Sequence, residues 1–315
     1  MKTALLCPGQ GAQSVGMGRD FYAQFPSARR LFDAADEQLG FSIKRLCFEG
    51  PAADLQATVH AQVGIYVTTA AIYEAVKETG KVRLPPDALA GLSLGEYTAL
   101  YLAGAFSFAE GLRLVHARGQ LMQQAAQMNP GTMVALLGAP DHVAEEICRQ
   151  VAAAGVGESS YDHVVVLANF NAPGQIVLSG SVHACRAACQ LAMARGLRTA
   201  PLDVAGAFHS PLMATAVEGM RKVLDAVPLA RPQTMTLSNV TAGPHGDLSE
   251  LRALLVRQLI SPVRWRQSLE YLQSQGVDTW LELGPGRVLT GLLKKLDRRA
   301  NVTNISTVEG WQAHE

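Results

Sequence analysis

The chain has 315 residues, of which 48% are hydrophobic and 17% charged, and its 27 basic residues balance 27 acidic ones. A neutral chain of this length buries a large core, and its overall charge gives no reason to expect nucleic acid as a partner. No apolar run approaches a membrane span and the N-terminus lacks a signal-peptide pattern, so we expect no membrane segment. Five cysteines without a C-x-x-C pair favour a reducing compartment and predict a cytoplasmic location.

The N-terminal third predicts alternating strands and helices. Residues 3–7 read as a buried parallel strand that ends at the sharp turn Pro8-Gly9-Gln10-Gly11. Helices are expected over 20–38, 53–58 and 63–77. A second short strand over 86–90 then leads through Gly91-Leu92-Ser93-Leu94-Gly95 into a helix over 97–102. This order of elements is typical of an α/β protein.

A Gly-x-Ser-x-Gly motif lies at that strand-to-helix junction. In a nucleophile elbow, Gly91 and Gly95 would leave room for a tight turn, with Ser93 at its tip and the helix N-terminus stabilising negative charge. The motif alone can also mark a simple Gly/Ser loop. The strand before it and the helix after it favour the nucleophile.

The middle of the chain predicts a separate small domain. A long amphipathic helix over 108–127 stops at Asn129-Pro130-Gly131. The elements expected after it are a strand at 132–137, a helix at 142–153, strands at 164–168 and 175–179 joined by Asn169 to Gly174, a helix at 182–195 and a strand at 198–202. This β-α-β-β-α-β order predicts a ferredoxin-like domain over 129–202, inserted into a larger domain made of 1–128 and 203–315.

The C-terminal part returns to the larger domain. A helix is expected to start with Ser210 as N-cap and Pro211 in its first turn. The remaining expected elements are a short strand at 234–237, helices at 249–258 and 265–275, a strand at 279–283 ended by Gly284-Pro285-Gly286, and a helix at 288–296. The tail from Thr307 to Glu315 carries no strong pattern, and we expect it to be poorly ordered.

Several motifs occur together in a characteristic order. They are Pro8-Gly9-Gln10-Gly11, Gly91-Leu92-Ser93-Leu94-Gly95-Glu96, Arg118, Asn169 to Gly174, Phe208-His209, Gln258 and Gly284-Pro285-Gly286. In this order and spacing the chain closely resembles the malonyl-CoA:acyl-carrier-protein transacylase family, from about residue 3 to about residue 300. That family contains bacterial fatty-acid enzymes and polyketide synthase acyltransferases. The resemblance implies an α/β-hydrolase-like large domain with a parallel sheet, with the active site between it and the small domain.

The resemblance also implies a Ser/His mechanism. Ser93 would be the nucleophile and His209 its general base, oriented by the main-chain carbonyl of Gln258. The backbone N–H groups of Gln10 and Leu94 would form the oxyanion hole. Malonyl-CoA would acylate Ser93, and the phosphopantetheine thiol of an acyl carrier protein would then take the malonyl group in a ping-pong reaction.

Four further positions bear on the acyl group. An arginine on a helix is usually solvated, but Arg118 matches the family position that pairs bidentately with the free carboxylate of malonate. Phe208 resembles the malonyl-selective members, in which a bulky side chain crowds an α-methyl branch. Gln62 matches a family glutamine near the site. Leu92 departs from the family, which usually has histidine before the nucleophile, so the pocket floor is expected to differ, and the effect on acyl preference stays open.

Partners and alternatives complete the expectations. No His, Cys or carboxylate cluster predicts a metal, and no cofactor is expected beyond the CoA and phosphopantetheine carriers. The segment 252–299 has nine basic and four acidic residues, which suits docking of an acidic carrier protein, although scattered solvated side chains explain it as well. The family suggests a monomer. An editing acyl hydrolase and a scaffold without catalysis remain as alternative functions, and fatty-acid and polyketide pathways are both open.

Overall fold

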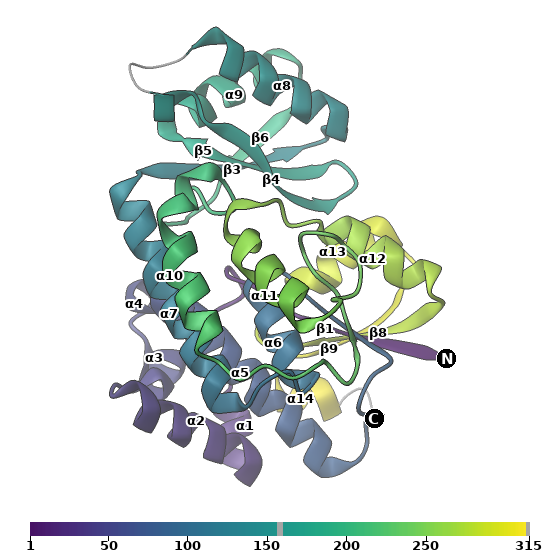
Figure 1. Ribbon diagram of the computed structural model, residues 1–315. Helices are drawn as coiled ribbons and strands as arrows, with labels where there is room; N and C mark the ends of the chain where they lie inside the picture. Colours follow the sequence, from purple (N-terminus) through teal and green to yellow (C-terminus); the bar gives the residue numbers. More distant parts are fainter. Residues whose placement is uncertain (156–159, 313–315) are drawn as a thin grey trace.

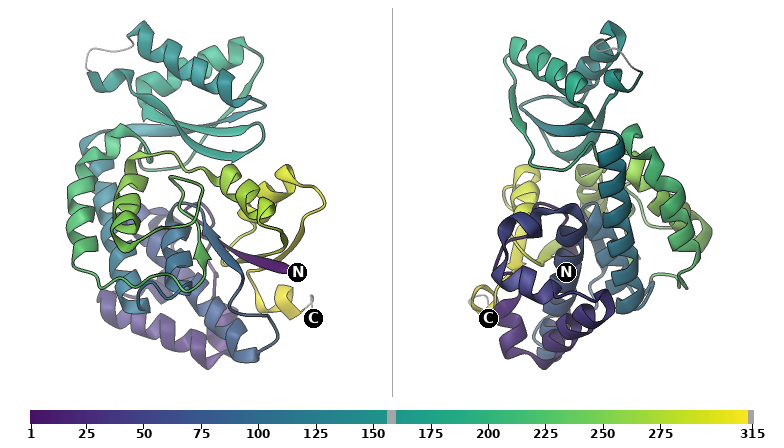
Figure 2. Two further views of the ribbon diagram at one scale, coloured as in Figure 1. Left: turned by 45° about the vertical axis from the view of Figure 1, so that its right-hand side comes forward. Right: turned by 90° about the vertical axis from the view of Figure 1, so that its left-hand side faces the viewer.

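The computed structural model describes residues 1–155 and 160–312 and divides into a large and a small part (Figure 1). The large part comprises β1 (Lys2–Cys7), α1 (Arg19–Gln24), α2 (Pro26–Leu39), α3 (Ile43–Glu49), α4 (Ala52–Gln56), α5 (Thr58–Thr79), β2 (Ala88–Gly91), α6 (Leu94–Leu102), α7 (Phe108–Met128), η2 (Pro211–Met213), α10 (Ala214–Asp225), β7 (Met235–Thr236), α11 (Leu248–Arg257), η3 (Gln258–Ile260), α12 (Trp265–Ser274), β8 (Val277–Leu283), α13 (Val288–Leu296), β9 (Asn301–Ile305) and α14 (Val308–Gln312). The small part comprises β3 (Gly131–Leu137), α8 (Asp141–Ala154), η1 (Ser160–His163), β4 (Val165–Ala172), β5 (Gln175–Ser181), α9 (Val182–Ala194) and β6 (Arg198–Pro201). The first and last described elements, β1 and α14, both belong to the large part (Figure 2).

A five-stranded parallel sheet forms the centre of the large domain, in the order β7-β2-β1-β8-β9. Its strands alternate between two apolar cores: Leu5 and Leu89 face the core built with α5, whereas Leu6 and Ala90 face the core covered by α12 and α13. Because the strands are parallel, the carboxyl ends of β1, β2 and β8 meet at one edge. The turns after these strands therefore come together there.

The small domain is an antiparallel sheet in the order β4-β5-β3-β6, with α8 and α9 on one face (Figure 1). Its first and third strands are central, as in the ferredoxin-like arrangement. Val134 and Leu136 pack under α8 and α9, while Met133 and Ala135 pack against the core of the large domain. The predicted α/β fold with an inserted ferredoxin-like unit is thus confirmed, and the division of the chain at 128/129 and 202/203 remains our proposal.

Two contacts join the domains beside this sheet. The backbone N–H of Phe170 donates to the carbonyl of Val263 at 2.9 Å, and the N–H of Val263 donates to the carbonyl of Ala168 at 2.8 Å. Arg266 on α12 donates two hydrogen bonds to the carboxylate of Asp141 on α8, at 3.0 and 2.5 Å. The cleft between the domains is therefore bordered by ordered backbone and side-chain contacts.

Two local predictions within these domains were wrong. The expected helix over 20–38 is two helices, because Phe25 is extended before Pro26, which takes the first position of α2. Residues 169–172 continue β4, so that only Pro173 and Gly174 separate it from β5. Register shifts within β4 explain why its pattern does not look like a strand.

The C-terminal tail was also mispredicted. Residues 308–312 form α14, and the buried Trp311 stacks on Phe21 at a ring-centroid distance of 6.4 Å. The rest of the tail, 313–315, lies outside the described residues. Trp311 is held by a partner 290 positions away in the sequence, which a local pattern cannot reveal. Within residues 1–155 and 160–312, no helix is both long and apolar enough to cross a bilayer.

Candidate active site

Ser93 occupies a strained turn between β2 and α6. Its backbone has φ 55° and ψ −103°, a conformation that costs a non-glycine residue about 1–3 kcal/mol. The turn is so tight that a Cβ on Gly91 would lie 1.9 Å from the carbonyl of Gly95, and one on Gly95 would lie 2.1 Å from the carbonyl of Cys7. The two glycines are therefore required by close backbone approach, and the turn has the form of a nucleophile elbow.

His209 is hydrogen-bonded to Ser93 across the cleft. The distance from Ser93 Oγ to His209 Nε2 is 2.7 Å, and His209 Nδ1 lies 2.7 Å from the carbonyl oxygen of Gln258. A carbonyl only accepts, so Nδ1 carries the proton and Nε2 is the free acceptor for the serine hydroxyl. Burial, followed by the charge of Arg118, lowers the pKa of His209 from 6.5 to about 4. The imidazole is consequently neutral at physiological pH, the form that a general base needs.

Arg118 is buried with its guanidinium beside the nucleophile. Only 1% of the residue is exposed. Its Nη2 donates to Ser93 Oγ at 3.0 Å and to Gln258 Oε1 at 2.8 Å, and its Nη1 donates to Gln62 Oε1 at 2.7 Å. The guanidinium also lies over the ring of Tyr97, 5.3 Å from its centroid. The usual expectation of a solvated helical arginine does not apply here.

The cleft above Ser93 is a pocket of about 410 Å³ lined by both domains. Its lining residues are Gln10, Gly11, Gln13, Gln56, Leu92, Ser93, Arg118, Met122, Met133, Asn169, Asn171, Gln175, Val177, Leu202, Asp203, Val204, Phe208, His209, Val288 and Leu292. A larger hollow of about 640 Å³ lies between the sheet and α14, but its lining holds no serine, cysteine, histidine or carboxylate. The chemistry therefore belongs to the smaller pocket. Across residues 1–155 and 160–312 no group of three His, Cys, Asp or Glu side chains could hold a metal ion.

Comparison with known proteins agrees with this geometry. The acyl transferase domain profile matches residues 4–313. The chain belongs to the acyl transferase family. It is 41% identical to the malonyl CoA-acyl carrier protein transacylase of Bacillus subtilis (strain 168) over 309 residues, 98% of this chain and 94% of the relative.

Solved structures extend this likeness to the fold. The acyl-carrier-protein S-malonyltransferase of Burkholderia pseudomallei superimposes with a TM-score of 0.93 at 36% identity, covering 100% of this chain and 99% of the other. A malonyl-transacylase solved in complex with its type II polyketide synthase acyl-carrier protein gives a TM-score of 0.93 at 34% identity, covering 99% and 98%. The predicted membership of the transacylase family is confirmed.

Within this acyl transferase, the nine predicted site residues lie in three places. Six of them line the pocket: Gln10, Leu92, Ser93, Arg118, Phe208 and His209. Gln62 and Gln258 are fully buried behind it and contact it through Arg118 and His209. Leu94 is the first residue of α6, which begins three positions earlier than predicted. Among the described residues, the backbone N–H groups of Gln10 and Leu94 donate no hydrogen bond within the protein.

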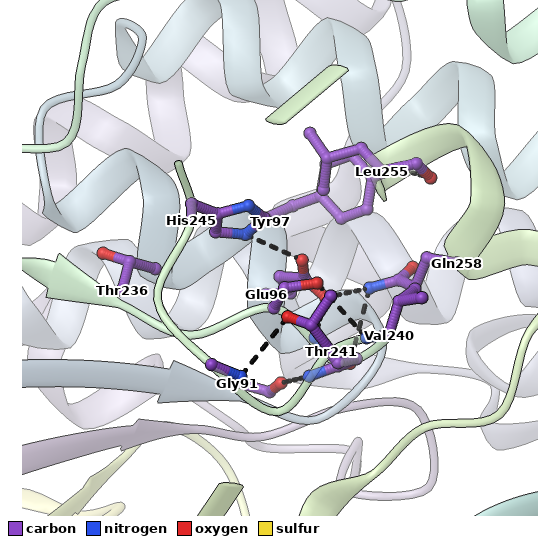
Figure 3. Close-up of polar contacts among 12 residues, drawn as sticks. Gly91, Glu96, Tyr97, Thr236, Val240, Thr241, His245, Leu255 and Gln258 are labelled. Atoms are coloured by element: carbon purple, nitrogen blue, oxygen red, sulfur yellow. Dashed lines mark hydrogen bonds and ion pairs between the residues drawn. The ribbon is translucent and has the colours of Figure 1, made fainter. Parts of the chain in front are cut away.

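The polar residues beneath the elbow of the acyl transferase were not predicted from the sequence. Asn239 follows β7, and its Oδ1 accepts from the N–H of Ser93 at 2.7 Å while its Nδ2 donates to the carbonyl of Gly91 at 2.7 Å. The buried carboxylate of Glu96 accepts from the N–H of Asn239 at 3.0 Å. His245 approaches the same carboxylate (Figure 3). No local signal identifies Asn239, because it lies beyond the short strand β7 and the sequence does not show that this strand is beside the elbow strand.

Proposed function

We propose that the protein transfers a malonyl group from malonyl-CoA to the phosphopantetheine thiol of an acyl carrier protein. The observation that carries this proposal is the buried Arg118 guanidinium, whose Nη2 lies 3.0 Å from Ser93 Oγ. A planar cation at this distance from the nucleophile suits an acyl group that ends in a carboxylate. The transacylase names of the relatives support the same substrate.

The first half-reaction makes a seryl ester. His209 Nε2 takes the proton of Ser93 as Oγ attacks the thioester carbon, and the N–H groups of Gln10 and Leu94 receive the oxyanion. The tetrahedral intermediate then collapses, the C–S bond breaks, and His209 returns its proton to the CoA thiolate. Arg118 loses its hydroxyl partner when Oγ becomes an ester oxygen, which frees Nη2 for the malonate carboxylate. The carrier thiol reverses these steps and restores free Ser93.

The pocket wall supports a carrier arm that is rich in amides. Asn169, Asn171 and Gln175 of the small domain line the pocket opposite Ser93, and the buried Oδ1 of Asn171 has no hydrogen-bond partner among the described residues. A pantetheine chain offers amide N–H groups to such acceptors. Phe208 and Leu92 line the acyl end of the pocket. Phe208 would disfavour an α-methyl branch, and Leu92 would alter the pocket floor.

We further propose that the acidic carrier protein docks along α13. Val288 and Leu292 of this helix line the pocket, Arg287 at its start is exposed, and Lys295 reaches Gln175 across the cleft. Three other basic residues of the segment 252–299 are already engaged within the protein, namely Arg252, Arg266 and Lys294. The docking surface is therefore narrower than the whole segment. Arg287→Glu with Lys295→Glu should slow carrier loading and weaken its salt dependence, whereas Arg30→Glu on α2 should not. Equal on-rates in all three proteins would contradict docking at α13.

A hydrolase is the alternative with the same dyad, and one experiment separates the two. Intact mass spectrometry after mixing the protein with malonyl-CoA and a phosphopantetheinylated carrier should show malonyl on Ser93 and then on the carrier. Arg118→Met should lower kcat/KM for malonyl-CoA about 100-fold, since two hydrogen bonds to a charged group are lost, while sparing acetyl-CoA. Free malonate with an unloaded carrier would indicate the hydrolase, and no acyl-enzyme would indicate a scaffold.

We also propose a cytoplasmic monomer, serving either fatty-acid or polyketide synthesis.

A further inference from the structure

Glu96 is a buried carboxylate that none of the steps above uses. It is 0% exposed and lies in the first turn of α6, three residues after Ser93. Its Oε2 accepts from Gln258 Nε2 at 2.6 Å and from the N–H of Asn239 at 3.0 Å. Its Oε1 lies 2.9 Å from Nε2 of His245, whose side chain is 1% exposed. Figure 3 shows His245 and Gln258 approaching the carboxylate from opposite sides.

The side-chain amide of Gln258 has only one favourable orientation in these surroundings. Its Oε1 faces Nη2 of Arg118 at 2.8 Å, and its Nε2 faces the carbonyl of Ser93 at 2.9 Å as well as Glu96. A flipped amide would turn its N–H groups toward a guanidinium and its oxygen toward a carboxylate and a carbonyl. The charges on its two sides therefore fix the amide, and the fixed amide holds Arg118.

His245 is brought to Glu96 by a folded loop. The residues after β7 turn back on themselves through a bridge between Leu237 and Pro244, and the N–H of His245 donates to the carbonyl of Thr236 at 2.9 Å. The ring N–H is not aligned for an ideal hydrogen bond with Oε1, yet no other donor reaches that oxygen among the described residues. An unpartnered buried carboxylate oxygen is costly, so His245 is the group that compensates Oε1, while Asn239 and Gln258 hold Oε2.

We propose that Glu96 and His245 form a positioning pair that sets the Gln258 amide and, through it, the Arg118 guanidinium. The pair does not touch the acyl group. It determines how strongly the site prefers an acyl chain that carries a carboxylate over one that does not. The inference rests on the proposed malonyl transfer, because Arg118 is its readout.

The experiment compares malonyl-CoA with acetyl-CoA as acyl donors, using rapid-quench formation of the acyl-enzyme. Glu96→Gln keeps the size of the side chain and removes its charge. We expect the ratio of kcat/KM for malonyl-CoA to that for acetyl-CoA to fall about tenfold, mainly through KM, as when one charge-assisted hydrogen bond is misdirected. His245→Leu should give a similar loss. His245→Gln, which keeps a donor near Oε1, should restore most of the preference.

Two controls separate positioning from mere support of the fold. Leu237 lies in the same loop as His245 and is fully buried, and its replacement by Val alters no polar contact of the pair. It should lower Tm without changing the malonyl-to-acetyl ratio. Gln258→Met removes the amide, so Glu96→Gln should reduce the ratio no further in that background.

Three outcomes would overturn the inference. The first is that Glu96→Gln and His245→Leu lower Tm as Leu237→Val does and leave the ratio unchanged. The second is that His245→Gln behaves like His245→Leu. The third is that the effects of Glu96→Gln and Gln258→Met multiply, which would mean that Glu96 acts on Arg118 by another route. Failure of the proposed function is distinguishable, because the unmodified protein would then either form no malonyl-enzyme or release its malonyl group as free malonate and leave the carrier unloaded.

Discussion

The two sides of the Ser93 turn differ in how their polar groups are used. On the pocket side, the hydroxyl of Ser93 has two changeable partners, His209 and Arg118, and the N–H groups of Gln10 and Leu94 have none among the described residues. On the underside, the N–H and the carbonyl of Ser93 are bonded to Asn239 and Gln258. The pocket side is left free for substrate, whereas on the underside both backbone groups of Ser93 are bonded.

This difference assigns separate tasks to the two sides. Catalytic groups on the pocket side must exchange partners when Ser93 is acylated, so their bonds in the free enzyme are temporary. The underside need not change during the reaction, and its bonds hold a backbone with φ 55° that is otherwise unfavourable. Preorganisation of the nucleophile is thus supplied from behind. Substitutions on the two sides should affect activity and stability in different proportions.

The largest difference between loss of activity and loss of stability is expected for Ser93→Ala. Loss of the nucleophile should reduce malonyl transfer by about 10³-fold or more and abolish the acyl-enzyme seen by intact mass spectrometry. The underside bonds use only the backbone of Ser93, so the free energy of unfolding should change by less than about 1 kcal/mol. A large loss of stability in urea titration would show that the hydroxyl also supports the fold.

Asn239→Leu should remove the hydrogen bonds on the underside of the Ser93 turn and lower both stability and activity. The N–H of Ser93 and the carbonyl of Gly91 would lose buried partners, which should cost about 2–4 kcal/mol of unfolding free energy. Acylation should slow by about 10- to 100-fold because the nucleophile is no longer held in place. Asn304→Leu is the matched control, since Asn304 also donates to a loop carbonyl, that of Gly286. It should lower stability with little effect on the acylation rate, and equal rate losses in both variants would contradict a special role for Asn239.

The pocket side was more predictable from the sequence than the underside. Ser93, His209 and Arg118 belong to motifs in which the residue types indicate a nucleophile, a general base and a carboxylate-binding cation. Asn239 and His245 come from a Gly- and Pro-containing loop, and they acquire a role only because β7 lies beside β2 in the sheet. That neighbour relation is a long-range property, absent from local periodicity.

The fold shows the same contrast. The alternating strands, the amphipathic helix over 108–127 and the ferredoxin-like order could be predicted because local pattern and burial agree. The edge strand β9 and the helix α14 were missed. Strand β9 is stabilised by pairing with β8, and α14 by contacts of Trp311 with Phe21 and Phe25. Both depend on partners that the local sequence does not contain.

Acid should act on the pocket side of the Ser93 turn through protonation of His209. Because burial lowers the pKa of His209 from 6.5 to about 4, the acylation rate should stay flat down to about pH 5 and fall as the pH passes through 4. Between pH 6.5 and 4 the unfolded chain binds a proton at this residue that the folded chain does not. The free energy of unfolding should therefore decrease as the pH falls, with a share from His209 of up to about 1.4 kcal/mol per pH unit.

His209→Gln removes the contribution of His209 to the pH dependence of the unfolding free energy, and so tests whether that contribution comes from His209. The variant should have a shallower dependence of unfolding free energy on pH over this window, measured by urea titration at each pH. An unchanged slope would mean that other groups account for the acid sensitivity. A pH–rate profile of the unmodified protein with a midpoint near 6.5 would contradict a depressed pKa for the base.

The smallest effect is expected at the rim, where Arg266 joins α12 to α8. The Arg266 and Asp141 side chains are 17% and 33% exposed, so water screens their ion pair despite its bidentate geometry. Arg266→Met should cost about 0.5–1 kcal/mol of unfolding free energy and change KM for malonyl-CoA less than about twofold. The backbone bonds of Val263 with Phe170 and Ala168 remain in the variant and still fix the small domain. A tenfold rise in KM would instead show that this exposed ion pair sets the width of the pocket, and that its geometry depends on the rim as much as on the buried residues beneath Ser93.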